Sequence, residues 1–138
     1  SRPDRSRNVV GMPTPEQVKA VAETYVSASN ANDKEKVLAQ FSADAVWHDP
    51  VGQPPHVGRA GVGEFYDQTR ALADRVEMKL HDVIVCGTEG AMVLEIRVTM
   101  GESVMIMDCI ETFEVDDNAR ISGMKAYWDM SRARTTSA

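Results

Sequence analysis

The sequence has few of the residues that build disulfides, zinc sites or redox centres. It contains two cysteines, Cys86 and Cys109, with no CxxC pair and no histidine pair of the HxxxH or HxH type. Each cysteine lies in an apolar, strand-like stretch, and we expect both to be buried free thiols rather than a disulfide. The sequence therefore predicts no metal site, and a reducing cytoplasm is the default location.

Long apolar runs and an excess of basic residues are also missing. No stretch has the length needed to span a membrane, and no signal-peptide core is found near the start. The formal net charge is −6, whereas a nucleic-acid-binding protein needs a basic face to neutralise phosphates. We therefore expect neither a membrane nor a nucleic acid as a partner.

The length and composition of the chain are typical of one globular domain. The 138 residues are 43% hydrophobic and 26% charged, which is enough to bury a core without disulfides. Residues 1–11 are polar and rich in arginine, so we expect a disordered N-terminal tail there. Residues 12–130 are predicted to form the domain, and residues 131–138 a flexible C-terminal tail.

Helical spacing of apolar residues dominates the first half of the chain. Thr14 and Gln17 match the two ends of a capping box at the start of the first helix. One face of that helix is predicted to be buried and consists of Val18, Val21, Ala22, Tyr25 and Ser29. A shorter second helix is expected to run through Phe41, and a third over residues 59–74.

The second half alternates between apolar and polar residues, which is the period of a strand. Strands are predicted at residues 79–86, 92–100, 103–115 and 120–128, with a hairpin turn at 116–119. Residues 45–50 are expected to be extended, because a residue that precedes proline avoids the α region. Helices followed by antiparallel strands indicate an α+β domain.

Three polar residues lie where apolar ones are expected. Tyr25 is on the core face of the first helix, and Asp49 precedes a proline; alone, these fit a core tyrosine and a turn residue. Glu111 shares a strand face with methionine, cysteine and phenylalanine, so it either reaches water at a sheet edge or is buried and held neutral. Asp108 faces the other side of that strand, where we expect a salt bridge.

These residues lie in segments that resemble the bacterial steroid Δ5-3-ketoisomerases, which belong to the SnoaL-like or nuclear transport factor two-like superfamily. The segments are residues 23–26, 30–33, 41–45, 49–55, 58–59, 64–66 and 124–128. The Asp-Pro-Val-Gly sequence at 49–52, which begins 24 residues after Tyr25, is the most specific. The resemblance implies a cone-shaped α+β barrel, in which a curved mixed or antiparallel sheet wraps around N-terminal helices. It also implies a homodimer and no cofactor.

The same resemblance implies a role for each matching residue. Asp49 corresponds to the general base, Tyr25 and Glu111 to hydrogen-bond donors for the ketone oxygen, and Tyr66 to a tyrosine that supports the Tyr25 hydroxyl. The residues implied to line the steroid pocket are Leu94, Met124 and Trp128. Glu111 replaces the family's protonated aspartic acid and is one methylene longer. The implied substrate is a 3-oxo-Δ5-steroid.

Two other functions fit the same fold. A SnoaL-like polyketide cyclase, dehydratase or epoxide hydrolase would use the same pocket, although a hydrolase of the Asp–Arg–Asp type is disfavoured because Arg97 is predicted on the polar face of its strand. In a non-catalytic module that binds small ligands, Asp49 and Glu111 would be structural. His48, beside the implied base, replaces an acidic residue, and no role is predicted for it.

Overall fold

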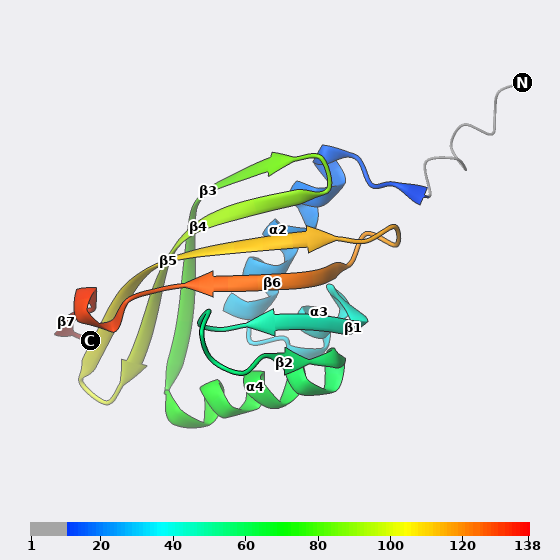
Figure 1. Cartoon of the computed structure of the whole chain (residues 1–138). Coiled ribbons are helices and arrows are strands. Elements are labelled where there is room, and N and C mark those ends of the chain that lie inside the picture. Colours follow the sequence, from blue (N-terminus) through cyan, green and yellow to red (C-terminus); the bar gives the residue numbers. More distant parts are fainter. Residues whose placement is uncertain (1–10) are drawn as a thin grey trace, which may run out of the picture.

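A curved sheet of seven strands wraps around three helices in the computed structural model, which describes residues 11–138 (Figure 1). The helices are α2 (Pro15–Asn30), α3 (Lys34–Ala39) and α4 (Gly58–Leu72). The strands are β1 (Phe41–His48), β2 (His56–Val57), β3 (Arg75–Cys86), β4 (Glu89–Met100), β5 (Ser103–Val115), β6 (Ile121–Tyr127) and β7 (Arg134–Ser137), with the 3-10 helix η2 (Met130–Arg132) before the last. The expected N-terminal tail lies almost entirely outside the described residues.

The sheet is mixed and is not closed into a complete barrel. Its strand order is β2-β1-β6-β5-β4-β3, and β7 pairs with β5 beyond the end of β6. Only the β1–β6 pair is parallel among the described strands, and the others are antiparallel. The predicted α+β class and the cone-shaped arrangement of a sheet around helices are therefore confirmed.

The first helix begins as the sequence predicted. The Thr14 hydroxyl accepts a hydrogen bond from the Gln17 backbone at 3.1 Å, and the Gln17 side chain accepts one from the Thr14 backbone at 2.8 Å. The predicted inner face of α2 is buried throughout. The second helix ends earlier than expected, at Ala39, because Phe41 pairs with Ile121 of β6 and begins β1.

Within the predicted C-terminal tail, residues Arg134–Ser137 form strand β7. Residues of β7 pair with Ser103–Ile106 at the part of β5 that β6 leaves free. Arg134 of β7 also forms an ion pair with Asp108 at 3.2 Å, which confirms the salt bridge expected for Asp108. The four residues of β7 are all polar, so their sequence lacks the alternation that predicts a strand. They form one because they pair with β5.

Both cysteines are free thiols, but their surroundings differ. Cys109 is buried in the middle of the sheet, as predicted, whereas Cys86 is exposed. Cys86 ends β3, the strand at one edge of the sheet, so it has a neighbouring strand on one side only.

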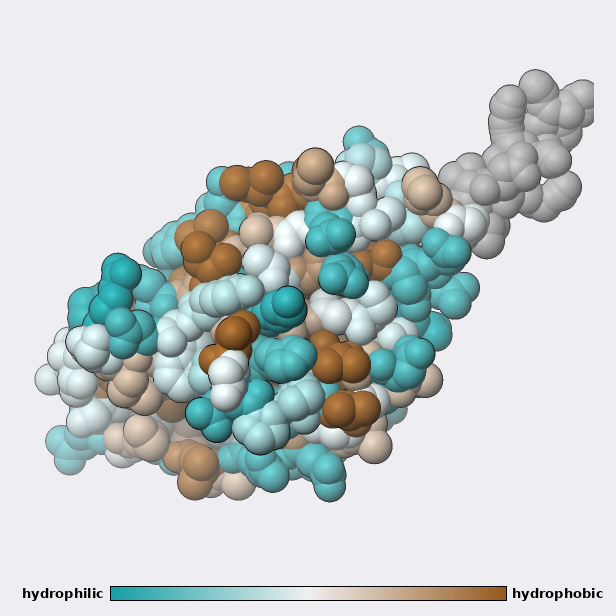
Figure 2. All heavy atoms as spheres, viewed as in Figure 1, coloured by the Kyte–Doolittle hydropathy of each residue, from teal (hydrophilic) through white to brown (hydrophobic). Residues whose placement is uncertain are grey.

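The two faces of the sheet have different surroundings. The helices cover the concave face, and the convex face is the one seen in Figures 1 and 2. Hydrophobic side chains on the convex face are scattered among hydrophilic ones (Figure 2). Val93, Ile110 and Tyr127 are partners across β4, β5 and β6, and the last two are 44% and 46% exposed.

Candidate active site

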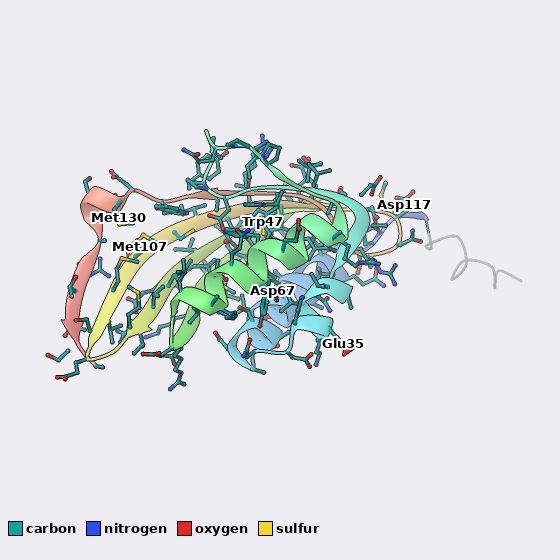
Figure 3. The ribbon with its side chains drawn as sticks, turned by 90° about the horizontal axis from the view of Figure 1, so that it is seen from below. Glu35, Trp47, Asp67, Met107, Asp117 and Met130 are labelled. Carbon is teal, nitrogen blue, oxygen red and sulfur yellow. The ribbon has the colours of Figure 1, made fainter. Side chains whose placement is uncertain are left out.

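An apolar cavity of about 440 Å³ lies between the concave face of the sheet and the helices. Its lining includes Tyr25, Asp49, Tyr66, Glu111 and Trp128, five of the seven residues that the resemblance singled out. Most of the remaining wall consists of methionine, valine, isoleucine and aromatic side chains. Figure 3 shows Trp47 between the sheet and α4, with Met107 and Met130 at the end of the sheet next to the C-terminal segment.

A larger hollow of about 690 Å³ is associated with β4, β5 and β6 and includes Val93, Ile110 and Tyr127. Neither Tyr25, Asp49 nor Glu111 lines it. We therefore assign the candidate chemistry to the smaller cavity, where these three side chains meet.

Asp49 is held at the end of β1 by contacts to β6. The adjacent His48 pairs with Lys125, and the Val51 backbone N–H donates a 3.0 Å hydrogen bond to the Ala126 carbonyl. The Asp49–Pro50 peptide bond is cis. Trp128 Nε1 then donates a 2.8 Å hydrogen bond to Asp49 Oδ1. The carboxyl group of Asp49 is thus fixed in orientation by a residue far along the chain.

The half-buried Asp49 carboxyl has a pKa raised above its usual value. Burial raises its pKa, while the hydrogen bond from Trp128 and the positive charge of a protonated His56 lower it. A carboxylate that is partly desolvated but still stabilised by a donor is more basic than one in water. His56, whose ring stacks on Phe65 with centroids 4.0 Å apart, was not singled out by the sequence.

Glu111 is buried at the centre of the sheet. It lies between Met92 of β4 and Ala126 of β6 and is only 1% exposed, so the alternative of an edge glutamate that reaches water is wrong. Burial, followed by the nearby negative charge of Asp49, raises the pKa of Glu111 to about 8, although hydrogen bonding with Tyr25 opposes this shift. Near neutral pH the group is therefore mostly a neutral acid and can donate a hydrogen bond.

Tyr25 brings a second donor from the opposite side of the cavity. Its side chain is 3% exposed, and its ring meets Phe41 and Trp47 edge-on, with centroids 5.9 and 6.3 Å away. Burial and the charges of Glu111 and Asp49 raise the pKa of Tyr25 well above its usual value. The hydroxyl therefore keeps its proton and can donate it in a hydrogen bond.

Tyr66 lines the cavity but contacts a different partner from the expected one. Its hydroxyl donates a short hydrogen bond to Asn32 Oδ1, and no hydrogen bond joins it to Tyr25 within residues 11–138. Asn32 lies in the turn between α2 and α3 and has a φ of 53°, a conformation that asparagine tolerates better than most residues. The sequence resemblance includes Asn32, but its contact with Tyr66 was not predicted.

Three buried polar atoms lack a hydrogen-bond partner in the described part of the chain, and all three belong to residues that line this cavity. They are Trp47 Nε1, Arg70 Nε and Glu111 Oε1. Buried polar atoms are nearly always paired, so unpaired atoms at three places in the cavity wall indicate that a ligand or water completes it. Neither Trp47 nor Arg70 was predicted as a site residue, because their side-chain directions depend on how β1 and α4 pack.

Leu94 and Met124, which were predicted to line the pocket, lie outside the cavity wall. Both are 1% exposed and face the core. They are paired with Cys109 and Phe113 of β5, whereas the strand residues in the cavity wall lie mostly further along, at Ile96, Val98, Met105 and Met107. His48 is half-buried and is not part of the wall either.

No group of three or more potential metal ligands is present in residues 11–138. Within the same residues, no helix has both the length and the apolar character needed to cross a membrane.

Comparison with known proteins agrees with this architecture. A steroid Δ-isomerase from Nocardioides simplex is 28% identical to the chain over 113 residues, which are 81% of this chain and 89% of that protein. The solved structure of the epoxide hydrolase/cyclase-like enzyme SalBIII, described as acting in pyran ring formation in the polyether salinomycin, superposes with a TM-score of 0.79. It covers 86% of this chain and 95% of its own at 19% identity, so this likeness concerns the fold. The SnoaL-like domain family matches residues 22–124, and the chain belongs to that family.

Proposed function

We propose that the protein is an isomerase that moves the double bond of a 3-oxo-Δ5-steroid from the Δ5 to the Δ4 position. The observation that carries this proposal is one apolar cavity in which two carboxyl groups have different environments. Asp49 is half-buried beside Trp128, whereas Glu111 is fully buried beside Tyr25. A base and an acid made from the same functional group need such a difference.

The reaction begins with removal of a proton from the carbon between the ketone and the alkene. The Asp49 carboxylate takes this proton, and the electron pair moves toward the ketone oxygen to form a dienolate. The protonated Asp49 then returns the same proton to the carbon at the far end of the dienolate, two carbons away. Proton and electrons balance within the substrate, so neither a cofactor nor an external acid is needed.

The ketone oxygen gains negative charge in the dienolate, and this is where Tyr25 and Glu111 act. Both are buried and both hold a proton near neutral pH, so each can donate a hydrogen bond to the developing oxyanion. Donors fixed in a water-poor site stabilise such a charge without reorganisation, and each is worth about 3–4 kcal/mol in comparable sites. Glu111 has one more methylene than the family's aspartic acid, so its carboxyl group extends further from the strand and places the donor at a different point.

The cavity suits a rigid apolar substrate. Its volume of about 440 Å³ lies within the range of pockets that enclose small organic ligands, and its walls are mostly aliphatic, aromatic and thioether side chains. The 28% identical relative is named a steroid Δ-isomerase, which supports the same substrate class. An Asp–Arg–Asp hydrolase is not supported, because the exposed Arg97 pairs with Glu95 at 2.8 Å away from the cavity, and Asp49 is the one aspartate in the cavity lining within the described residues.

The direct test is conversion of 5-androstene-3,17-dione, followed by the ultraviolet absorbance of the conjugated enone. We expect rapid conversion that Asp49→Asn reduces by about 100- to 10,000-fold while steroid binding persists. Asp117→Asn is the matched control, since it removes the same charge from an exposed turn and should convert the steroid normally. Absence of conversion by the unaltered protein, or near-normal conversion by Asp49→Asn, would refute this assignment.

We further propose that two copies pair through the convex face of the sheet. The neighbouring apolar side chains of Val93, Ile110 and Tyr127 support this, because a partner would remove them from water. Sedimentation velocity should give a dimer, and Ile110→Glu should shift it toward the monomer. A monomer at all concentrations would refute the pairing.

A further inference from the structure

Arg70 is the one cationic side chain in the cavity lining, and no ion pair within residues 11–138 includes it. It projects from α4, one helical turn after Tyr66. A charged group that faces an apolar cavity without a counter-ion is costly, and such groups are normally paired. Arg70 therefore has no counter-ion within the described part of the chain.

Part of the Arg70 side chain has a structural role. Its Nη2 donates hydrogen bonds to the Ser29 carbonyl at 2.9 Å and the Ser29 hydroxyl at 2.8 Å. The guanidinium also stacks over the Tyr66 ring at 4.6 Å from its centre. The last turn of α2 has no basic residue of its own, so Arg70 supplies a positive charge at that helix end.

These contacts leave most of the guanidinium unused. Arg70 Nε is buried and has no hydrogen-bond partner in the described part of the chain, and Nη1 donates to no protein group there. An N–H of a guanidinium that donates to a carboxylate makes a charge-assisted hydrogen bond, which is stronger than a neutral one. Nη1 is therefore the donor that can reach an anionic oxygen carried by the ligand.

Arg70 lies in the last turn of α4 and is not among the charges that shift the pKa values of the two carboxyl groups. The shifts in the pKa of Asp49 and Glu111 have other causes, among them Trp128. Along α4, Arg70 lies between Tyr66 and Leu72, which is 78% exposed and also lines the cavity. Arg70 and Leu72 therefore line the cavity toward the exposed end of α4, where the end of a ligand remote from its ketone can lie.

We propose that Arg70 binds a carboxylate carried by the ligand at the end remote from its ketone. The inference rests on the proposed function and narrows its substrate class to 3-oxosteroids with an acidic substituent. The net charge of the protein is −6, so general electrostatic attraction would not favour an anionic ligand. A preference for the acid therefore reports a specific site.

The test compares two ligands that differ in charge and little in shape: a 3-oxo-Δ4-steroid 17β-carboxylic acid and its primary carboxamide. Their dissociation constants are measured by isothermal titration calorimetry at neutral pH. We expect the acid to bind at least about tenfold more tightly, as a charge-assisted hydrogen bond would give. Equal affinity for the two ligands would overturn the proposal without any variant.

Variants then assign the preference to Arg70. Arg70→Met should bring the ratio of the two constants to within about twofold of unity, and Arg70→Lys should keep part of the preference. Because the ratio is taken within each protein, a general loss of affinity cancels. Arg75→Met removes the same charge from an exposed position and should leave the ratio unchanged. A ratio that survives Arg70→Met would overturn the proposal.

This experiment can fail independently of the isomerase assignment. Turnover of the neutral 5-androstene-3,17-dione tests the isomerase, and the affinity ratio tests Arg70. Turnover with no preference for the acid would refute the Arg70 site alone. An Arg70-dependent preference without turnover would refute the isomerase and leave an anion-binding cavity.

Discussion

Trp128 Nε1 donates a 2.8 Å hydrogen bond to Asp49 Oδ1, although 79 residues separate the two in the chain. The parallel pairing of β1 with β6 makes this contact possible, since it brings the ends of both strands to the same edge of the cavity. The donor lowers the pKa of Asp49 against the opposite effect of burial. This hydrogen bond therefore sets both the direction and the basicity of the proposed base.

Loss of this donor should move the activity to higher pH. Trp128→Phe keeps an aromatic wall but removes the N–H, so the pKa of Asp49 rises further and a higher pH is needed to form the carboxylate. The acid limb of kcat/KM against pH should shift upward, and the activity at lower pH should fall by about tenfold. Tyr127→Phe is the adjacent control on the exposed face. An acid limb that does not move would show that Trp128 does not tune Asp49.

The two proposed oxyanion donors can be tested through substitutions of Glu111. An amide still donates a hydrogen bond, whereas leucine cannot, so Glu111→Gln should be milder than Glu111→Leu. We expect Glu111→Leu to lower kcat by about 100- to 1,000-fold, the usual loss for one oxyanion donor. Circular dichroism checks that both variants fold. Equal losses would mean that Glu111 does not act as a donor.

The decrease of kcat/KM at high pH should report the ionisation of Glu111. The pKa of Glu111 is raised to about 8, so its protonated form prevails below that pH. Above it, the residue loses its proton and places a negative charge where the dienolate oxygen forms. We therefore expect kcat/KM to fall as pH rises through about 8, and Glu111→Gln to lack this limb. A limb that persists in Glu111→Gln would belong to another group.

The sequence predicted the groups whose position follows from a regular repeat. Tyr25 lies on the helical face that the apolar spacing defined, and Glu111 on the strand face that alternation defined. The resemblance added Asp49, which lies in no regular element. These three side chains meet in one cavity because the sheet curves around α2, as the family fold implied.

The rest of the cavity depends on contacts that no local pattern contains. Arg70 belongs to a helix whose rotation is fixed only by packing, and no role was predicted for Trp47. Leu94 and Met124 point inward, as alternation predicts. Whether an inward residue faces a ligand depends on where the cavity lies along the strands, and alternation does not predict that. Sheet curvature is set by all strands together, so a single strand cannot predict it.

The Tyr66–Asn32 contact should appear as a stabilising coupling. Tyr66→Phe removes the donor, and Asn32→Gly removes the acceptor while glycine keeps the φ of 53°. In a double-mutant cycle from urea unfolding, we expect a coupling of about 1 kcal/mol, the usual net value of a hydrogen bond. If the two losses add within about 0.4 kcal/mol, the hydrogen bond contributes nothing to the free energy of unfolding.

The buried Glu111 should also make the folded state less stable as pH rises from 4.5 to about 8. Its pKa is raised from a reference of 4.5 to about 8 in the folded protein, so between these values the folded state holds a proton that the unfolded state has released. Folding therefore binds a proton there, and the free energy of unfolding decreases as pH rises, by up to about 1.4 kcal/mol for each pH unit. Glu111→Gln has no such proton, so its free energy of unfolding should change less over this range. Urea unfolding between about pH 5 and 8 measures both proteins, and a parallel pH dependence in the two would mean that Glu111 keeps an ordinary pKa in the folded state.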